Sequence, residues 1–473
     1  MQIITSKQNK HLTELRSNKP AWIAIGGLIL FTFLGILLGA GSIIRLFFPI
    51  ASLATGLYLY SNFPILYIGF TWWLWFLTPF VSRLIDYRSG WDPSRLVLVT
   101  PFIVTIITTI TVVKHLLKTY KYGGLPFFMV FVAISYATLI GLVNNQLFAV
   151  ARSFLDWFAP VAFAFHIWVN WREYPRYRQV IQSTFLWGLL IMGVYGIFQY
   201  LVAPEWDGFW LVESGMTSSS GSPEPLGMRV WSTMHSRGPF ASTMQAGLLL
   251  VFTHKSIWRF PAAIAGTISL LLSTVRSAWG GWILSLLLFI PSLKSRLQLK
   301  IITTLLIFII IIVPLTRVEP FKSQIQSRLQ TLTNIEKDSS FQARQDIYSE
   351  SFKIALSTFQ GRGLGYTWSF EEQKFGSLVI DSGILDTFFT LGWIGAIPYL
   401  GGLLLIVINI IKNDLFSHDS FLNTTRALGI SYCATLIIGS IMLSVGGMLL
   451  WGFLSITLAG KKYYFKNKGL KDI

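Results

Sequence analysis

The chain has 473 residues, of which 53% are hydrophobic and 12% are charged, and its formal net charge at pH 7 is +17. This composition excludes a soluble globular protein, because apolar stretches long enough to cross a hydrocarbon core about 30 Å thick recur along the chain. The basic excess does not indicate a nucleic-acid-binding protein, since Lys and Arg collect on one side of the membrane protein that these stretches predict.

Fourteen apolar stretches are predicted to be transmembrane helices, with twelve and thirteen left open as the true number. In chain order they lie at residues 21–39, 44–60, 63–81, 97–113, 126–143, 150–170, 184–202, 240–254, 260–274, 277–292, 299–316, 386–411, 427–443 and 446–460. The residues before them lack the apolar core and cleavage site of a signal peptide, which predicts that the first stretch is an uncleaved anchor. We therefore expect an all-α, polytopic integral membrane protein.

Lys and Arg residues predict the side of the membrane on which each connection lies, because positive side chains accumulate in the cytoplasm. With the N-terminus inside, the tails 1–20 and 461–473 and the even-numbered connections hold all of the excess positive charge. Both termini are therefore predicted to be cytoplasmic. The basic balance then reflects topology and contact with anionic lipids, and no nucleic-acid partner is expected.

Two of the predicted outer connections are long. The first, 203–239, is rich in Gly, Ser and Pro and interrupts a helical bundle at 21–316. The second, 317–385, precedes the last helices at 386–460, and a connection of this length is usually functional or disordered. This division predicts a membrane bundle with one large exoplasmic loop and no separate soluble domain.

The second loop carries its own helical pattern. Apolar residues recur at spacings of three and four from Tyr348 to Phe359, which predicts a short amphipathic helix on the membrane surface. The helix is predicted to end at Gly361-Arg362-Gly363-Leu364-Gly365, because glycines permit turns that other residues resist. We expect this loop to fold against the membrane part.

Three charged residues are candidates for catalysis. Arg229, Arg276 and Asp381 are all predicted to lie at the outer membrane surface, where an ionisable group is usually paired or functional. Guanidinium groups suit the oxygens of phosphate and pyrophosphate. The three residues together suggest a site that grips a lipid diphosphate while a base activates a hydroxyl. Two structural interpretations stay open, in which Arg276 is a lipid-headgroup anchor and Asp381 with Ser382 caps a helix.

The other polar residues are weaker indicators of a functional site than these three. Arg237, Arg344, Glu224 and Trp231 are further candidates for substrate binding, although Arg344 could instead balance the loop acids. The six histidines, with His235 expected to be solvated, show no metal-ligand spacing, and Cys433 is the single cysteine. We find no phosphate-binding glycine loop and no Asp-x-Asp motif. Neither a metal nor another cofactor is therefore expected.

Three patches within residues 180–400 resemble the superfamily of O-antigen ligases and Wzy-type polysaccharide polymerases. The segment Arg229–Ala241 is similar to the family's Arg-x-x-Gly-Thr-Phe-x-Asn-Pro-Asn-x-x-Ala element, and Thr274–Trp279 is similar to its Ser-Arg-(Gly/Ala) element. The stretch from Arg344 to Gly395 resembles the family's large periplasmic loop and the helix after it. The resemblance implies a GT-C-like membrane glycosyltransferase that uses undecaprenyl-diphosphate-linked glycans.

Carried over to this chain, the resemblance implies that Arg229 and Arg276 bind the diphosphate and stabilise its negative charge as it departs. Two departures stand out. Lipid A-core ligases of the family carry a loop histidine where this chain has Asp381, and the family's Asn-Pro-Asn is replaced by Ser236-Arg237-Gly238. The missing histidine favours a polymerase over a dedicated ligase, and Asp381 could still act as a general base.

The leading hypothesis is therefore polymerisation of lipid-linked oligosaccharide repeats on the outer face of a bacterial inner membrane. The product would be an exopolysaccharide, a capsule or an O-antigen. Transfer of a finished glycan to a lipid or protein acceptor is the first alternative, and transport of a small anion such as bicarbonate is the second. The expected partners are the undecaprenyl-diphosphate-linked glycan and membrane lipids, with a flippase and a chain-length regulator as further candidates.

Overall fold

The structure is a computed structural model that describes residues 18–293, 295–299, 301–303, 359–366, 368–369, 374–375, 382–412 and 419–467. Within these ranges nine helical segments are long and apolar enough to cross a membrane. They are α2 (Lys19–Leu37), α3 (Gly41–Asn62), α4 (Pro64–Ser89), the run from η1 to η3 (Leu96–Tyr122), α7 (Leu125–Asn144), α8 (Leu147–Val169), η4 with α9 (Trp171–Val202), α18 (Gly383–Ile411) and α20 (Ser444–Asn467). The chain is thus an all-α, multi-pass membrane protein.

Four shorter helices lie where further spans are predicted. They are α12 (Arg237–Leu250), α13 (Arg259–Leu272), α14 (Arg276–Phe289) and α19 (Ser420–Thr435), of 14, 14, 14 and 16 residues. A straight crossing needs about 20 residues, so their length alone does not mark them as spans. The predicted stretch 299–316 lies mostly outside the described residues. The total of 12–14 spans stays a prediction.

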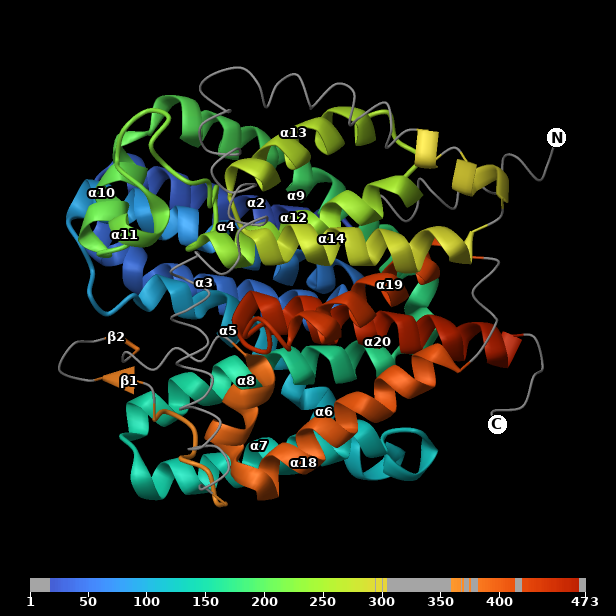
Figure 1. Ribbon diagram of the computed structural model, residues 1–473. Coiled ribbons are helices and arrows are strands. Elements are labelled where there is room, and N and C mark those ends of the chain that lie inside the picture. The colour runs from blue at the N-terminus through green and yellow to red at the C-terminus, as the bar shows by residue number, and fades with distance from the viewer. Residues whose placement is uncertain are drawn as a thin grey trace, which may run out of the picture.

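The long helices run side by side and bring distant parts of the sequence together (Figure 1). The closest neighbours are α7 with α18, α8 with α20, α9 with α13, and α19 with α20. The small helices α10 (Glu205–Glu213) and α11 (Thr217–Ser220) lie at one end of the bundle, which we call the α10 end. The antiparallel pair β1 (Trp368–Ser369) and β2 (Lys374–Phe375) lies at the same end.

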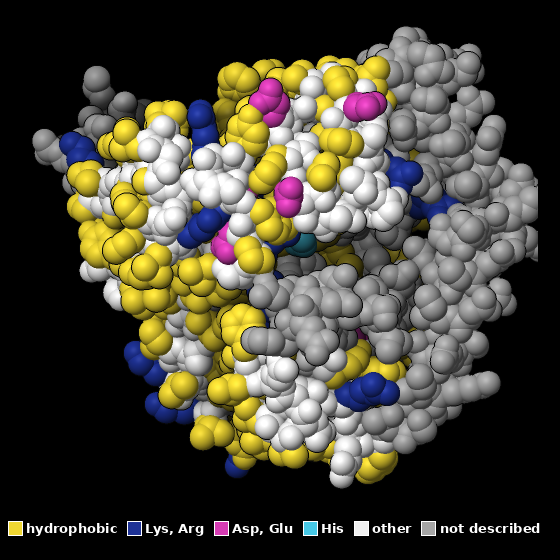
Figure 2. Space-filling model, turned by 90° about the vertical axis from the view of Figure 1, so that its left-hand side faces the viewer, with side chains coloured by type: hydrophobic (Ala, Val, Ile, Leu, Met, Phe, Trp, Pro, Cys, Tyr) yellow, Lys and Arg dark blue, Asp and Glu magenta, His cyan; other side chains and the backbone are white. Residues whose placement is uncertain are grey.

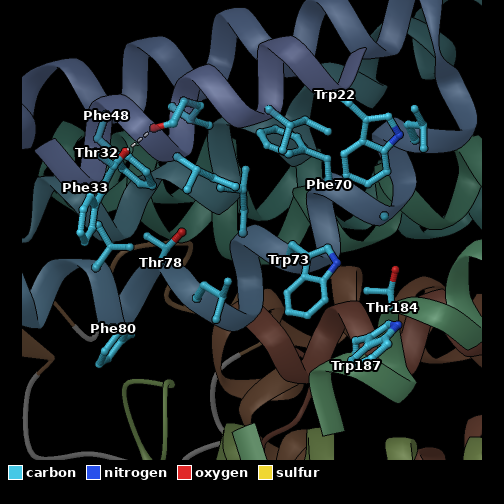
Figure 3. A pocket seen from close by; sticks show the side chains of 18 of the residues that line it. Trp22, Thr32, Phe33, Phe48, Phe70, Trp73, Thr78, Phe80, Thr184 and Trp187 are labelled. Carbon is cyan, nitrogen blue, oxygen red and sulfur yellow. Dashed lines mark hydrogen bonds between the residues drawn. The ribbon is translucent and has the colours of Figure 1, made fainter. Parts of the chain in front are cut away.

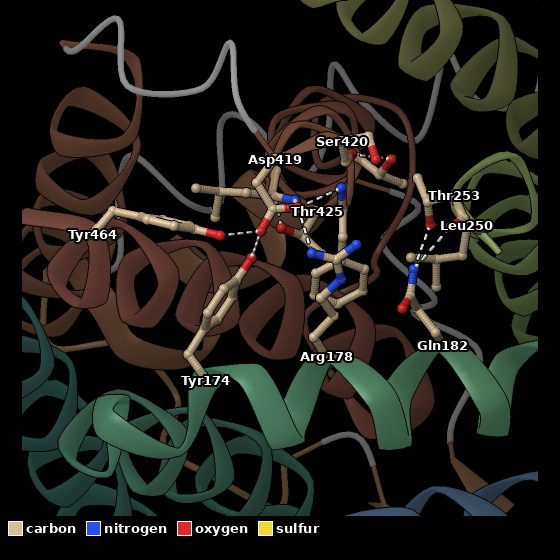
Figure 4. Close-up of polar contacts among 12 residues, drawn as sticks. Tyr174, Arg178, Gln182, Leu250, Thr253, Asp419, Ser420, Thr425 and Tyr464 are labelled. Carbon is tan, nitrogen blue, oxygen red and sulfur yellow. Dashed lines mark hydrogen bonds and ion pairs between the residues drawn. The ribbon is translucent and has the colours of Figure 1, made fainter. Parts of the chain in front are cut away.

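At the opposite end, Asp419 ties three helices together (Figure 4). Its carboxylate caps α19 by accepting from the backbone N–H groups of Phe421 and Leu422, and it pairs with Arg178 of α9 at 3.1 Å. It also accepts hydroxyl hydrogen bonds from Tyr174 at 2.8 Å and Tyr464 at 2.9 Å. Helix α19 therefore begins at Ser420, seven residues before the predicted start, because Asp419 satisfies its first free N–H groups.

The glycine turn predicted at residues 361–365 is confirmed. Gly361, Gly363 and Gly365 have φ values of +76°, +78° and +88°, which side-chain-bearing residues rarely adopt. The turn is wedged against the bundle: the Leu364 N–H donates to the carbonyl of Ala137 in α7, and the Gly363 N–H donates to that of Thr390 in α18, each at 3.0 Å. This described part of the loop therefore packs on the membrane part, as predicted for the loop.

Helix α18 is interrupted where this turn meets it. Gly392 has φ +62° and ψ −177°, so the helix is kinked at that residue. On either side of the kink, the Arg362 N–H donates to the Phe389 carbonyl at 3.1 Å, and the Trp393 N–H donates to the Phe359 carbonyl at 2.9 Å. The turn thus supplies hydrogen-bond partners to backbone groups that an unbroken helix would pair internally.

Candidate functional site

Two of the candidate arginines lie at one short segment at the α10 end, and the loop that carries a third packs its backbone against that segment. Arg276 is the first residue of α14, and Arg237 is the first residue of α12. The Nη1 of Arg237 donates to the Thr274 hydroxyl at 3.1 Å, two residues before Arg276. Val230, which follows Arg229, donates its backbone N–H to the carbonyl of Leu272 at 3.2 Å. The guanidinium of Arg237 therefore lies beside the segment 272–276, which ends in Arg276, and the backbone next to Arg229 is fixed to the same segment.

The side chain of Arg229 is held within its own loop. Its Nη1 donates to the carbonyl of Ser219 at 2.9 Å, and its backbone N–H donates to the carbonyl of Ser220 at 2.8 Å. These contacts order the loop between α11 and α12 and leave the guanidinium half-buried. The geometry is compatible with both binding of an anion and a purely structural role for Arg229.

A buried ion pair anchors this loop to the bundle. Arg83 of α4 and Asp207 of α10 are both fully buried, with Nη1 and Oδ1 3.1 Å apart. Arg83 also donates to the carbonyl of Ser232 at 2.5 Å, and Gln199 of α9 donates to Asp207 at 2.8 Å. The amide oxygen of the same Gln199 accepts from the backbone N–H groups of Trp231 and Ser232. The loop before Arg237 is therefore fixed by α4, α9 and α10 together.

His235 lies in a second group of cations. Burial, together with the positive charges of Arg152, Arg83 and Arg95, lowers its pKa from 6.5 to about 4. The side chain is half-buried rather than solvated, so the expectation for this residue was wrong. The imidazole is neutral at pH 7, where it can accept a proton or a hydrogen bond. His235 is two residues from Arg237 in the sequence. It therefore lies between Arg237 and the group formed by Arg83, Arg95 and Arg152.

Arg95 is desolvated in the same neighbourhood. Its guanidinium stacks over the ring of Trp91 at 3.8 Å from the centroid, with the Trp210 ring at 5.7 Å. Burial lowers the pKa of Arg95, whereas Asp86 and Asp92 oppose the shift. The residue also has a positive φ of +53°, which is uncommon without glycine. The aromatic rings stabilise the cation, whereas the positive φ is a backbone strain of a kind that clusters at functional sites.

The α10 end combines these charges with a hollow in the surface (Figure 2). Lys and Arg side chains surround a face that also carries acidic residues, and a histidine is visible in the hollow beside basic side chains. Arginines on separate helices can present several N–H groups to one anion. The arrangement suits a phosphate or diphosphate better than a neutral ligand.

An apolar cavity of about 820 Å³ approaches this end from the membrane (Figure 3). It lies between α2, α4 and α9 and is lined by aromatic side chains such as Trp22, Trp73 and Trp187. Phe80 also lines it, and the guanidinium of Arg83 lies 5.6 Å from the centre of the Phe80 ring. A hydrocarbon chain in the cavity would therefore end close to Arg83.

The remaining candidates are placed differently. Trp231 is fully buried and packs on Trp210 with ring centroids 5.9 Å apart, which is a core position. Glu224 is exposed on the loop. Asp381 and Arg344 lie outside the described residues. Ser382 next to Asp381 is the cap of α18, since its hydroxyl accepts from the Leu385 N–H at 3.5 Å. The roles of these residues in binding stay predictions.

Arg83, Arg95 and Arg152 are not among the residues predicted from the sequence. Each is charged and lies within or beside an apolar stretch, and that property alone could have marked them. Nothing local in the sequence indicates that Arg83 pairs with Asp207, because the two residues lie on different helices.

No group of three or more His, Cys, Asp and Glu side chains in the described part of the chain is arranged to hold a metal ion. No protein family and no curated protein was found to match this chain.

The neutral state of His235 has a consequence for stability. A base whose pKa falls from 6.5 in the unfolded chain to about 4 in the folded chain stabilises the protein above pH 6.5. That contribution is lost as the pH falls from 6.5 to 4, because the unfolded chain then binds the proton first. The melting temperature of the purified protein is therefore expected to fall over this range.

The matched variant for this prediction is His235→Gln, which keeps a polar side chain but does not titrate. Its melting temperature is expected to fall less than that of the wild type between pH 6.5 and 4. Parallel curves for the two proteins over that range would show that His235 does not titrate with a lowered pKa.

Proposed function

We propose that the chain is a glycosyltransferase that joins lipid-diphosphate-linked glycans, as the sequence resemblance implies. The observation that supports the proposal is that Arg237 donates to Thr274, two residues before Arg276, while the backbone N–H of Val230, next to Arg229, donates to Leu272 of the same segment. An apolar cavity approaches the same end of the bundle. A lipid diphosphate needs both features: cations for its charged head and an apolar path for its hydrocarbon chain.

In this proposal the α10 end faces the outer side of a bacterial plasma membrane, as the distribution of Lys and Arg predicts. A hydroxyl of one glycan attacks the anomeric carbon of another, and the bond from that carbon to the diphosphate oxygen breaks. The arginines stabilise the negative charge on the departing diphosphate. The proton of the hydroxyl passes to a base, for which Asp381 is the predicted residue and neutral His235 a second one.

The growing chain is proposed to be a polymer of repeat units, such as an exopolysaccharide, capsule or O-antigen. Asp381 in place of the histidine of lipid A-core ligases favours this activity over transfer of a finished glycan. The expected partners in the membrane are a flippase that supplies the lipid-linked repeat and a regulator of chain length.

The test uses Arg229→Ala and Arg276→Ala in the native host. Removing one group that stabilises charge in a transition state costs about 100-fold to 1,000-fold in rate. Polymer is therefore expected to disappear while single lipid-linked repeats accumulate, with the protein level unchanged. Polymer length on gels, mass spectrometry of lipid-linked intermediates and immunoblots measure these three quantities.

The control is Arg88→Ala, which removes an exposed arginine at the C-terminal end of α4. This variant is expected to make normal polymer. Normal polymer in both test variants would refute the proposal. Accumulation of full-length polymer still attached to its lipid carrier would instead identify a ligase, because such an enzyme acts after polymerisation.

A further inference from the structure

A second cavity, of about 500 Å³, lies at the end of the bundle opposite α10. Its wall is built by η3 (Tyr120–Tyr122), the start of α7, the end of α8, α18 and α20. These helices meet here although they are far apart in the sequence. The cavity is remote from the arginines of the α10 end, and the proposed glycosyl transfer does not use it.

The charged residues around this cavity are all basic. Its lining includes Lys121, Lys461, Lys462 and Lys466, and among the described lining residues none is acidic. Three of these lysines lie within six residues on α20, and the fourth comes from the connection before α7. Four ammonium groups around one cavity create a positive potential that favours an anionic ligand.

Two of the lysines are held in defined positions. Lys461 is 8% exposed, and its Nζ donates to the side-chain oxygen of Asn409 at 2.7 Å and to the backbone carbonyl of the same residue. The Nζ of Lys462 lies 4.7 Å from the centre of the Trp168 ring. A buried ammonium and a cation over an indole ring are features of a formed site rather than of a freely solvated surface.

The rest of the lining is apolar. Leu405 and Ile406 of α18 and Leu458 of α20 form the part of the cavity nearer the middle of these helices. The side chain of Leu405 is also 41% exposed on the outside of the bundle, where lipid would cover it. The cavity is therefore basic towards the helix ends and apolar towards the membrane interior, which complements the negative headgroup and the apolar acyl chains of an anionic phospholipid.

We propose that this cavity binds the phosphate headgroup of an anionic phospholipid, with the lysines around the phosphate and the acyl chains along α18. Basic pockets between transmembrane helices are known to bind such headgroups. The bound lipid would link η3, α18 and α20, and it is expected to stabilise the bundle by mass action.

The test measures the melting temperature and lipid binding of the purified full-length protein with phosphatidylglycerol and, separately, phosphatidylcholine. Phosphatidylglycerol is expected to raise the melting temperature and to remain bound in native mass spectra, and phosphatidylcholine is not. Each lysine near an anionic headgroup contributes about 1 kcal/mol. The double variant Lys462→Gln/Lys466→Gln is therefore expected to bind phosphatidylglycerol at least about tenfold more weakly.

The matched control is Lys114→Gln/Lys118→Gln, which removes the same charge from exposed positions outside the cavity and should bind as the wild type does. Since Lys466 is exposed, Lys466→Gln alone tests the site should the double variant fold poorly. Equal losses in both double variants would overturn the proposal, as would equal stabilisation by phosphatidylcholine. Stabilisation by inorganic phosphate equal to that by phosphatidylglycerol would assign the site to free phosphate and not to a lipid.

Discussion

Replacing Arg83 by alanine is expected to destabilise the protein by about 3–5 kcal/mol, which is the cost of removing one partner of a buried ion pair. Arg83 and Asp207 are both fully buried, so the substitution leaves a carboxylate without its cation and without water. The hydrogen bonds from Tyr195 and Gln199 to Asp207 remain, but they do not neutralise its charge. The loop that carries Arg229 is expected to lose its anchor to α4 at the same time.

Thermal unfolding of the purified protein in detergent measures this effect, with Arg88→Ala as the control for loss of an exposed arginine at the same end of α4. The double variant Arg83→Met/Asp207→Leu is expected to be more stable than Arg83→Ala, because an apolar pair of similar volume leaves no unpaired charge. Equal melting temperatures for the wild type and Arg83→Ala would show that the pair contributes no net stability.

The nine long helices are predictable from the sequence because each of them is an apolar stretch long enough to cross the bilayer. The residues at which these helices begin and end are less predictable, because polar side chains that contact other helices help to fix those boundaries. Helix α19 is the example: apolar pattern alone places its start at residue 427, whereas the cap and ion pair of Asp419 place it at Ser420. The cap is local to α19, whereas Arg178 of α9 and Tyr464 of α20 hold the capping carboxylate in place.

The candidate site is predictable to a similar degree. Arg229 and Arg276 could be chosen as charged residues predicted at the outer membrane surface, and in the structure the backbone next to Arg229 is hydrogen-bonded to Leu272, four residues before Arg276. The pair of Arg83 with Asp207 could not be chosen, because its partners become neighbours only when α4 packs against α10. The lowered pKa of His235 follows from the same long-range packing, which surrounds the imidazole with arginines from other elements.

The glycine turn at residues 361–365 leads to a second large expected effect. Gly363→Ala is expected to destabilise the protein by about 2–4 kcal/mol, as the sum of two costs. An alanine at a positive φ costs about 1 kcal/mol, and overpacking of a filled interior costs about 1–3 kcal/mol. The added Cβ would lie 2.3 Å from the backbone nitrogen of Gly141 in α7, and backbone cannot rotate away as a flexible side chain can.

Hydrogen exchange measures this effect locally and thermal unfolding measures it globally. The N–H groups of Arg362, Gly363 and Leu364 donate to carbonyls of α18 and α7, so their exchange is expected to be faster in the variant. Gly280→Ala is the matched control, because Gly280 lies in α14 and has no atom within 4 Å of an added Cβ. That control is expected to be neutral or up to about 1 kcal/mol more stable, owing to the helix propensity of alanine.

These measurements distinguish a turn that fastens the second loop to the bundle from a turn that only connects two segments. If the turn fastens the second loop, which the proposed function makes part of the site, to the bundle, Gly363→Ala frees residues 362–364 from α7 and α18. Polymer formation is then expected to fall even where the remaining protein stays folded. Unchanged exchange at residues 362–364 together with normal polymer would mean that α7 and α18 can separate enough to admit a methyl group, and that the close approach of the three backbones is not required.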